Sequence, residues 1–280
     1  MNHILPILKE MLSKPKLQRV PEQMVMALEA QTQDFFNFGL GDTALRAAYL
    51  FHAKWASRTF ANCKRVLDLG TGPANQLSIL AQMNPSIEFV GVDLSDKMLE
   101  LAQNNCAKLG VKNVTFVQDD MTQLSQLKAG EFDGVFSSVA LHHLPNELDV
   151  EKTFKNARRV LKDRYSVYIT DFLLVKNEQS IRYLLSLNET QPAVFKQDYE
   201  ASLRASFPKR DFQRAASQYL DEAELYTSFG AQFLMVLKTP SYDLSQSAQS
   251  LLNSELERLS PATKNIYKSL AILMALRGMF

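Results

Sequence analysis

From Lys64 onward, short apolar runs alternate with amphipathic stretches, and this alternation constrains the fold more than any other feature of the sequence. The apolar runs include RVLDL, EFVGVDL, VTFVQ, FDGVFSSVA and SVYITDF, and helical stretches such as DKMLELAQNNCAKL and EKTFKNARRVLK separate them. A repeated strand and helix requires crossover connections and therefore predicts a parallel sheet. Because the runs are apolar on both sides of the pleat, we expect helices on both faces of this sheet.

The segments that flank the alternating core are predicted to be helical. Residues 1–60 form an N-terminal helical cap, because PEQMVMALEAQTQDFF and GDTALRAAYLFHAKWASRTF carry apolar residues at helical spacing. Residues 61–240 form the sheet domain, which we expect to close with an antiparallel pair, AELYTSF and AQFLMVLKT. The long helical interval at 172–207 departs from the usual short connections, so we interpret it as an insertion and a candidate lid.

Residues 241–280 are predicted to form a helical C-terminal extension. Its last helix begins at Ser260 and Pro261 and carries an apolar stripe. The stripe consists of Ile266, Leu270, Leu273 and Leu276. A helix docked on the domain is the simplest interpretation, and a homodimer contact or a hydrophobic lid would produce the same pattern. Only three basic residues accompany the stripe, which disfavours binding to a membrane surface.

Composition and charge narrow the class of partner. The 280 residues include 31 Lys and Arg against 30 Asp and Glu, for a formal net charge of +1. This balance argues against a nucleic-acid partner and favours a small or neutral one. The two cysteines, Cys63 and Cys106, belong to no CxxC or Cys/His cluster, so we expect neither a disulfide nor a metal site. Since no apolar stretch approaches the roughly 20 residues of a membrane span, we expect a soluble cytoplasmic protein.

A glycine turn follows the first apolar run, in the stretch VLDLGTGPANQ. Gly70 and Gly72 let the chain turn sharply and bring backbone N–H groups close to a ligand at the carboxyl edge of the sheet. A dinucleotide-binding turn would carry a third glycine where this chain has Asn75, and would not place the carboxylate of Asp68 before a pyrophosphate. Asp68 instead favours a ligand with a cationic group, and the amino-acid end of S-adenosylmethionine (SAM) supplies an ammonium.

Two further predicted strands also end in acidic residues. Asp93 ends the second strand, where a carboxylate can accept hydrogen bonds from both hydroxyls of a ribose. The third strand ends in VQDDM, where Asp120 can accept from an adenine amino group and Met121 can pack on the ring. Asp119 is the alternative for the adenine contact. Together, the three strand ends describe one adenosine with an amino-acid tail.

These motifs resemble those of the Rossmann-like class I SAM-dependent methyltransferases over about residues 64–172. The similar stretches are VLDLGTGPA, GVDLSDKMLELA, QDDM, FDGVFSSVALHHLP and ARRVLKDRYSVYITDF, with looser similarity in RVPEQM and DYEASLRASF. The resemblance implies an α/β fold with a doubly wound seven-stranded sheet whose last strand is antiparallel, and SAM as the cofactor. It places ten residues at the cofactor: Asp68, Gly70, Thr71, Gly72, Asp93, Leu94, Met98, Asp120, Met121 and Ser137.

The chain departs from the family pattern at three places. Ala74 stands where a third glycine is usual, and its small side chain should still fit. Ser138 stands where an Asn often contributes a polar contact to the methionine part of SAM. The sequence DRY, residues 163–165, replaces the usual Pro-Gly-Gly before the fifth strand.

His142 and His143 follow the fourth strand, on the side from which a methyl acceptor approaches. A neutral imidazole there can remove a proton as the acceptor attacks, whereas histidines that only pack or form hydrogen bonds are the alternative. Tyr168 in the fifth strand is a third candidate catalytic residue, with a core position as its alternative. Six further residues are candidate acceptor contacts, and plain packing or helix surface is the alternative for them. These residues are Phe35, Phe36, Phe38, Asp171, Tyr183 and Tyr199.

The sequence thus predicts a SAM-dependent methyltransferase that acts on a small-molecule acceptor. Because the sulfonium activates its own methyl group, such a protein mainly holds the reactants in line and excludes water. A SAM-using enzyme of non-methylating chemistry, such as cyclisation that releases methylthioadenosine, is one alternative. A non-catalytic SAM-binding regulatory subunit is the other.

Overall fold

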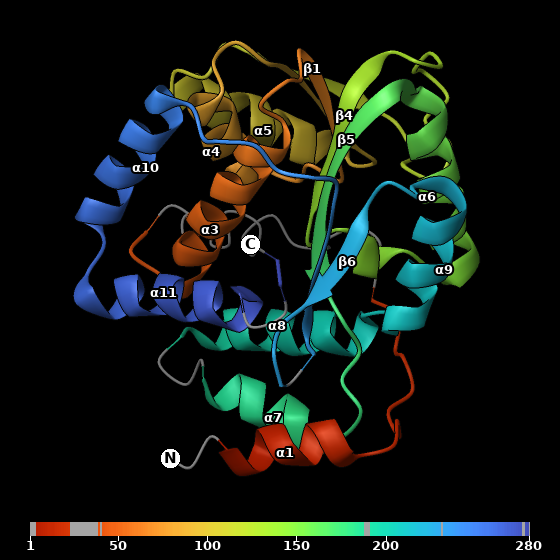
Figure 1. Cartoon of the computed structure of the whole chain (residues 1–280), viewed down its shortest axis with the longest axis vertical. Coiled ribbons are helices and arrows are strands. Elements are labelled where there is room, and N and C mark those ends of the chain that lie inside the picture. The colour runs from red at the N-terminus through yellow and green to blue at the C-terminus, as the bar shows by residue number, and fades with distance from the viewer. Residues whose placement is uncertain are drawn as a thin grey trace.

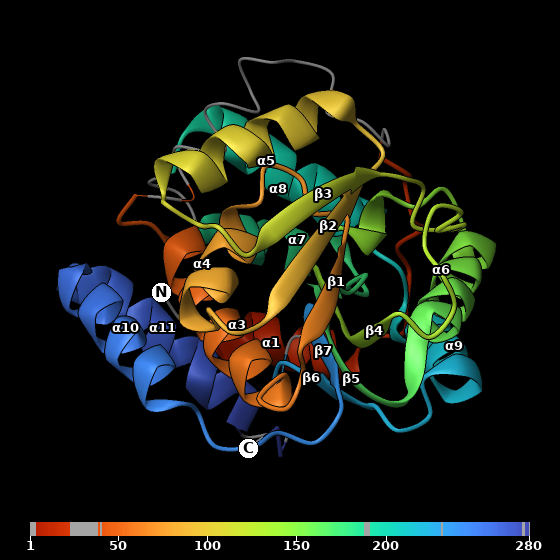
Figure 2. The ribbon, with the colours of Figure 1, turned by 90° about the horizontal axis from the view of Figure 1, so that it is seen from above.

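A seven-stranded sheet forms the centre of the molecule, with strand order β3-β2-β1-β4-β5-β7-β6. The computed structural model describes residues 4–22, 39, 41–187, 191–230, 232–275 and 278–279. Helices cover both faces of the sheet (Figures 1 and 2). The doubly wound α/β fold expected from the alternating sequence pattern is therefore confirmed.

The strands pair as the sequence pattern predicts. Their bounds are β1 Arg65–Leu69, β2 Glu88–Asp93, β3 Val114–Gln118, β4 Phe132–Ser138, β5 Leu161–Phe172, β6 Glu224–Thr227 and β7 Leu234–Lys238. The first five strands run parallel to one another. β7 runs antiparallel to both β5 and β6, which confirms the predicted antiparallel pair at the sheet edge.

Helices connect these strands and extend the chain beyond them. Their bounds are α1 Ile4–Leu12, α3 Ala44–Thr59, α4 Asn75–Met83, α5 Asp96–Lys108, η1 Leu141–His143, α6 Glu147–Val160, α7 Glu178–Ser186, α8 Ala193–Ala205, α9 Lys209–Tyr219, α10 Gln246–Arg258 and α11 Pro261–Ala275. Polar side chains mark several helix starts. Ser95 accepts a hydrogen bond from the Met98 amide before α5, and Asn146 accepts from two amides at the start of α6.

Alternate residues of each strand enter two separate cores. Val135 of β4 packs in the core that α6 and α9 cover, where Phe154 and Phe212 lie. Phe136, the next residue along β4, packs in the opposite core with Trp55 of α3. A strand that is buried on both faces must be apolar at successive positions, which explains the continuous apolar runs of the sequence.

The helical insertion after β5 is present as α7 and α8. Both helices lie with α1 beyond the carboxyl ends of the parallel strands (Figure 1). α1 is fixed to α7 through Glu10, whose carboxylate accepts from the Lys176 amide at 2.9 Å and from the Ser180 hydroxyl at 2.6 Å. This arrangement covers the sheet edge where the predicted ligand contacts lie, and the role of a lid stays a prediction.

The C-terminal extension packs against α3 (Figure 1). Ser260 accepts from the Thr263 amide, as expected for the start of α11, and Leu270 packs on the core that contains Trp55. Ile266 is 37% exposed, so part of the predicted stripe faces solvent, whereas Leu276 lies outside the described residues. No helix in the described ranges has the length and apolar character to cross a membrane. The homodimer contact and the domain boundaries at 60 and 240 stay predictions.

Candidate active site

The glycine turn after β1 is pinned to β2. The amides of Gly70 and Thr71 both donate to the Val92 carbonyl at 2.9 Å. Gly70 has φ +68°, a conformation that favours glycine. A Cβ there would also lie 2.6 Å from the Cβ of Ala140, so the packing requires glycine as well. Gly72 has φ +51°, but a Cβ there would meet nothing within 4 Å. Gly72 therefore leaves open space in front of the turn, where a ligand can approach the backbone.

Asp68, just before this turn, is a buried carboxylate that needs a cation. Its residue is 3% exposed, and no basic side chain in the described part of the chain forms an ion pair with it. Burial and, to a lesser extent, the nearby carboxylate of Asp93 raise the pKa of Asp68 to about 7. A ligand ammonium placed here would stabilise the ionised form. Contact between Asp68 and the amino-acid end of SAM stays a prediction.

Asp93, at the end of β2, has a fixed orientation. Its Oδ2 accepts from the Gly72 amide at 2.8 Å, and its Oδ1 accepts from the Ser95 amide at 3.0 Å. Each carboxylate oxygen offers two acceptor positions, so both oxygens keep one for a ribose hydroxyl. Burial raises the pKa of Asp93, and the amides partly offset this effect by stabilising the charged form. The same carboxylate thus holds the glycine turn and faces the predicted ribose site.

The two acidic residues after β3, Asp119 and Asp120, differ in their exposure to solvent. Asp119 is 8% exposed, and its oxygens accept from the amides of Asp120 and Gln126, both at 2.8 Å. Those bonds assign Asp119 to the structure of the loop. Asp120 accepts from the Thr122 amide at 2.8 Å and from the Gln123 side-chain amide at 3.0 Å, but it is only partly buried, so a ligand can still reach its carboxylate. The structure therefore favours Asp120 over Asp119 for a contact with adenine.

The other predicted cofactor residues occupy different environments. The Met121 side chain lies against the glycine turn, with its Cε 3.0 Å from the position that a Cβ on Gly70 would take. Leu94 is 43% exposed beside Asp93, and Met98 lies buried in α5. Ser137 is fully buried and donates to the Leu69 carbonyl at 2.9 Å, which favours a structural role for its hydroxyl. Cofactor contacts by these four residues stay predictions.

We expect Gly72→Ala to weaken SAM binding at least tenfold, because its Cβ occupies the space through which the ligand reaches the turn. Gly110→Ala is a matched control: Gly110 also has positive φ, +67°, and open space around its Cβ position. Both variants should lose about 1–2 kcal/mol of stability from the left-handed backbone. Calorimetric titration with SAM and urea denaturation separate the two effects. If the two variants bound SAM with equal affinity, SAM would not bind at the turn that contains Gly72.

SAM affinity should fall as the pH drops below 7, because only ionised Asp68 attracts the ligand ammonium. With a pKa of about 7 in the free protein, protonation should weaken binding about fivefold between pH 7 and pH 6. The pH has the opposite effect on the stability of the protein without ligand. Because the pKa of Asp68 is higher in the folded than in the unfolded state, the free energy of unfolding should increase as the pH falls from 7 toward 4. Calorimetry at both pH values checks the change in affinity, and Asp68→Asn should bind SAM weakly and without this dependence.

A second group of polar side chains lies beside the turn, at the ends of β4 and β5. Asp171 is completely buried, and its Oδ2 accepts from the amides of Leu141 at 2.7 Å and His142 at 3.1 Å. Its Oδ1 lies 2.8 Å from Nδ1 of His142 and accepts from the Phe172 amide at 2.7 Å. Asp171 therefore holds η1 in place and orients the ring of His142. This favours a positioning role, and direct contact with an acceptor stays a prediction.

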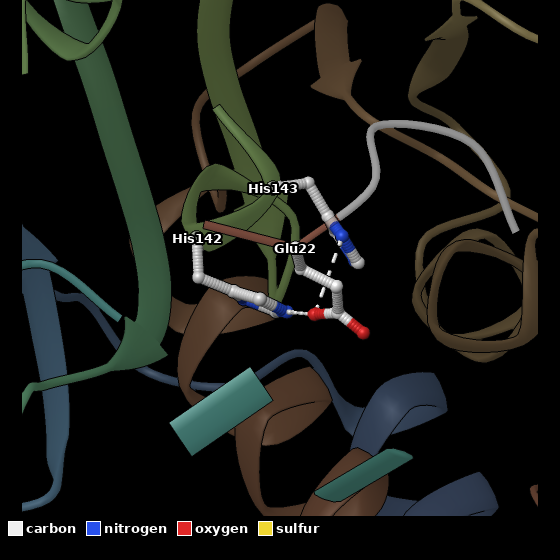
Figure 3. A group of neighbouring side chains, drawn as sticks. All are labelled: Glu22, His142 and His143. Carbon is white, nitrogen blue, oxygen red and sulfur yellow. Dashed lines mark ion pairs between the residues drawn. The ribbon is translucent and has the colours of Figure 1, made fainter. Parts of the chain in front are cut away.

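The two histidines face a carboxylate that sequence reasoning missed, Glu22 (Figure 3). Nε2 of His142 lies 3.8 Å from Oε2 of Glu22, and Nδ1 of His143 lies 3.6 Å from the same oxygen. Burial disfavours the charged form of His142, but the carboxylates of Asp171 and Glu22 raise its pKa above the usual value. Burial likewise raises the pKa of Glu22. The predicted catalytic pair thus forms part of a larger polar cluster.

Arg19 fixes the segment that carries Glu22. Its guanidinium donates to the carbonyls of Ala205 and Pro145 at 2.6 Å and of His142 at 2.9 Å, and lies 3.8 Å above the ring of Phe207. The N-terminal segment is therefore clamped between η1 and the end of α8. Arg19 and Glu22 both belong to the stretch RVPEQM, whose looser family similarity was the signal for them in the sequence.

The tyrosines predicted at the acceptor side are dispersed. Tyr168 is fully buried, and its hydroxyl lies 2.9 Å from Nδ1 of His52, which favours the core alternative. Tyr199 of α8 packs edge-on against Phe172, at 5.4 Å between ring centroids, and Phe172 in turn packs on His142. Tyr183 lies partly buried on α7. A further set of candidate contacts lies outside the described residues: Phe35, Phe36 and Phe38.

The sheet order and the acid-ended strands define a Rossmann-like class I methyltransferase fold with a site that fits SAM. The sequence matches the family described as "Methyltransferase domain" over residues 61–252, and the chain belongs to this family of SAM-dependent methyltransferases. An S-adenosylmethionine-dependent methyltransferase of Aquifex aeolicus superposes with a TM-score of 0.51 at 16% identity, over 76% of this chain and 98% of that one. The plantazolicin methyltransferase BamL, in complex with a triazolic desmethylPZN analog and SAH, superposes with a TM-score of 0.54 at 18% identity, over 84% of this chain and 86% of that one. These likenesses confirm the fold.

The curated relatives differ in the acceptors that their names state. The 27-O-demethylrifamycin SV methyltransferase of Amycolatopsis mediterranei is 29% identical over 55% of this chain and 57% of its own length. The tRNA (guanine-N(7)-)-methyltransferase of Streptococcus pneumoniae is 22% identical over 61% of this chain and 86% of its own length. The chain spans 19%, 12% and 57% of the length of three curated relatives that it matches. The relatives therefore do not decide between a small molecule and an RNA as acceptor.

Proposed function

We propose that this chain transfers the methyl group of SAM to a small-molecule acceptor that enters beside His142 and His143. One observation carries the proposal: the loop after β4 joins the cofactor turn to the histidine pair. A Cβ on Gly70 would touch Ala140, and His142 follows two residues later, held by buried Asp171. A cofactor at the turn and an acceptor at the histidines would therefore be neighbours.

In methyl transfer from SAM, the main task of the protein is to position the cofactor and the acceptor. SAM supplies a methyl group already activated by its sulfonium. Asp68 and Asp93 bind and orient the two ends of the adenosyl ligand, and the covering helices α7 and α8 exclude water. The ring nitrogens of the histidine pair are the polar groups that orient the acceptor, and Asp171 prevents the His142 ring from turning away.

Charge supports a small acceptor over a nucleic acid. The formal net charge of +1 provides no general attraction to a phosphate backbone. The side chains nearest the histidines include the carboxylates of Glu22 and Asp198, which would repel one. A rifamycin methyltransferase among the relatives is consistent with a small acceptor.

The proposal is tested by incubating the purified protein and isotopically labelled SAM with a cell extract divided into a low-molecular-weight fraction and an RNA fraction. We expect S-adenosylhomocysteine and a labelled product only with the low-molecular-weight fraction, detected by mass spectrometry. Label transferred to RNA would overturn the small-molecule acceptor. Release of methylthioadenosine, or SAM binding without turnover in any fraction, would overturn methyl transfer itself.

A further inference from the structure

Three potential metal ligands converge from two distant parts of the chain, and the proposed methyl transfer does not explain why they do so. Glu22 comes from the N-terminal segment, and His142 and His143 come from η1. Their ligand atoms all lie within 4.8 Å of one another. The side chains point toward a shared space between the segment and η1 (Figure 3).

The separations in this cluster are too long for hydrogen bonds. Oε2 of Glu22 lies 3.8 Å from Nε2 of His142 and 3.6 Å from Nδ1 of His143, whereas an N–H···O bond spans about 2.7–3.2 Å. Two ligands of a tetrahedral ion at 2.0–2.1 Å are roughly 3.3 Å apart. Small rotations of the side chains would therefore bring all three atoms into ligand distance of one ion.

His142 is already prepared as a metal ligand. Because the carboxylate of Asp171 only accepts hydrogen bonds, Nδ1 of His142 carries a hydrogen, and in the neutral ring, the form that binds a metal, Nε2 presents its lone pair to the cluster. That Nε2 is buried, and within the described residues it has no hydrogen-bond partner. A carboxylate that orients a histidine through its second nitrogen is the usual partner of a metal-binding imidazole.

The surroundings are rigid and negatively charged. Arg19 donates to four neighbouring carbonyls, those of Ala205, Pro145, His142 and Leu144, and thereby holds the segment that carries Glu22. Asp198 of α8 adds a negative charge that acts on both His142 and Glu22. With Asp171, three carboxylates therefore lie near His142, so a cation would relieve repulsion between these negative groups.

We propose that Glu22, His142 and His143 bind a divalent transition-metal ion. Two imidazoles and one carboxylate suit Zn²⁺ or Fe²⁺, whereas Mg²⁺ and Ca²⁺ prefer sites made of oxygen ligands. Three protein ligands leave at least one coordination position open. In combination with the proposed function, on which this last step rests, the open position receives an oxygen or nitrogen atom of the acceptor.

The sequence predicted no metal site because that expectation rested on the cysteines. Adjacent histidines alone are no metal motif, and the third ligand lies far away in the sequence. Only the folded chain brings Glu22 to η1.

The test is metal binding by the full-length protein in the absence of SAM and acceptor. After treatment with a chelator and dialysis, we expect calorimetry to detect one Zn²⁺ per chain, little or no Mg²⁺, and visible absorption of bound Co²⁺ typical of a site with nitrogen and oxygen ligands. Glu22→Gln and His143→Ala should each weaken Zn²⁺ binding at least a hundredfold. Asp171→Asn, which removes no ligand but alters the hydrogen bond that orients His142, should weaken it about 10–100-fold.

Glu10→Gln is the matched control, because Glu10 anchors the same N-terminal region to α7 without approaching the histidines. It should bind Zn²⁺ like the unmodified chain. The proposal is overturned if the unmodified chain binds no Zn²⁺ or Co²⁺, or if Glu22→Gln and His143→Ala retain full affinity. Because this measurement needs no turnover, its failure would leave methyl transfer unaffected, and loss of methyl transfer would leave metal binding unaffected.

Discussion

Replacing Asp93 by alanine is expected to weaken SAM binding at least a hundredfold. We predict that the carboxylate accepts hydrogen bonds from both ribose hydroxyls, and hydrogen bonds to a charged group contribute about 1.5–3 kcal/mol each. The substitution also removes the acceptor for the Gly72 amide, so the turn that faces the ligand loses its anchor. Calorimetric titration with SAM gives the affinity, and thermal unfolding with and without SAM checks it independently.

Glu88→Ala is the control for this variant, since Glu88 is the acid at the opposite end of the same strand. It is exposed, and its ion pair with Arg65 spans 3.4 Å, so its removal should change neither SAM affinity nor stability by much. Asp93→Asn keeps one acceptor oxygen and should bind SAM with intermediate affinity. If Asp93→Ala bound SAM as tightly as Glu88→Ala does, the prediction that Asp93 binds the ribose would be wrong.

The fold was predictable because the information for it is local. Each buried strand is a run of apolar residues, and each crossover helix has its own periodicity, so the order of elements follows from short windows of sequence. The antiparallel edge was predictable for the same reason, since β6 and β7 are separated only by a short connection around Gly230. The pairing of α11 with α3 depends on contacts between distant segments, and local patterns carry little of that information.

The cofactor side of the site was predictable because strand ends supply it. Asp68 and Asp93 follow apolar runs directly, and parallel strands bring their carboxyl ends to one edge. The choice between Asp119 and Asp120 was not predictable, because it depends on which of the two carboxylates the folded loop buries. This burial is decided by the path of the loop after β3.

The acceptor side was only partly predictable. The histidine pair stood out, but the residues around it come from both flanks of the core. Arg19 and Glu22 lie in RVPEQM, and Asp198 lies in DYEASLRASF, the two stretches whose family similarity had no assigned role. The structure brings these two stretches together at η1.

Asp171→Ala should be the most destabilising of these substitutions, with a loss of about 3–5 kcal/mol in the free energy of unfolding. The carboxylate is fully buried, and its removal leaves the amides of Leu141, His142 and Phe172 without their acceptor, together with Nδ1 of His142. Each buried group left unpaired costs about 1–3 kcal/mol. Urea denaturation measures the loss.

Asp133→Ala provides a matched comparison for that measurement. Asp133 on β4 also accepts from two backbone amides, those of Lys64 and Arg65, and from the ammonium of Lys162. Because Asp133 is partly exposed, water can replace its carboxylate, and the loss should be about 1 kcal/mol. Asp171→Asn keeps one acceptor oxygen and should fall between the two. Equal losses for Asp171→Ala and Asp133→Ala would mean that the loop after β4 does not depend on the Asp171 carboxylate, and the histidine pair would then need another source of its orientation.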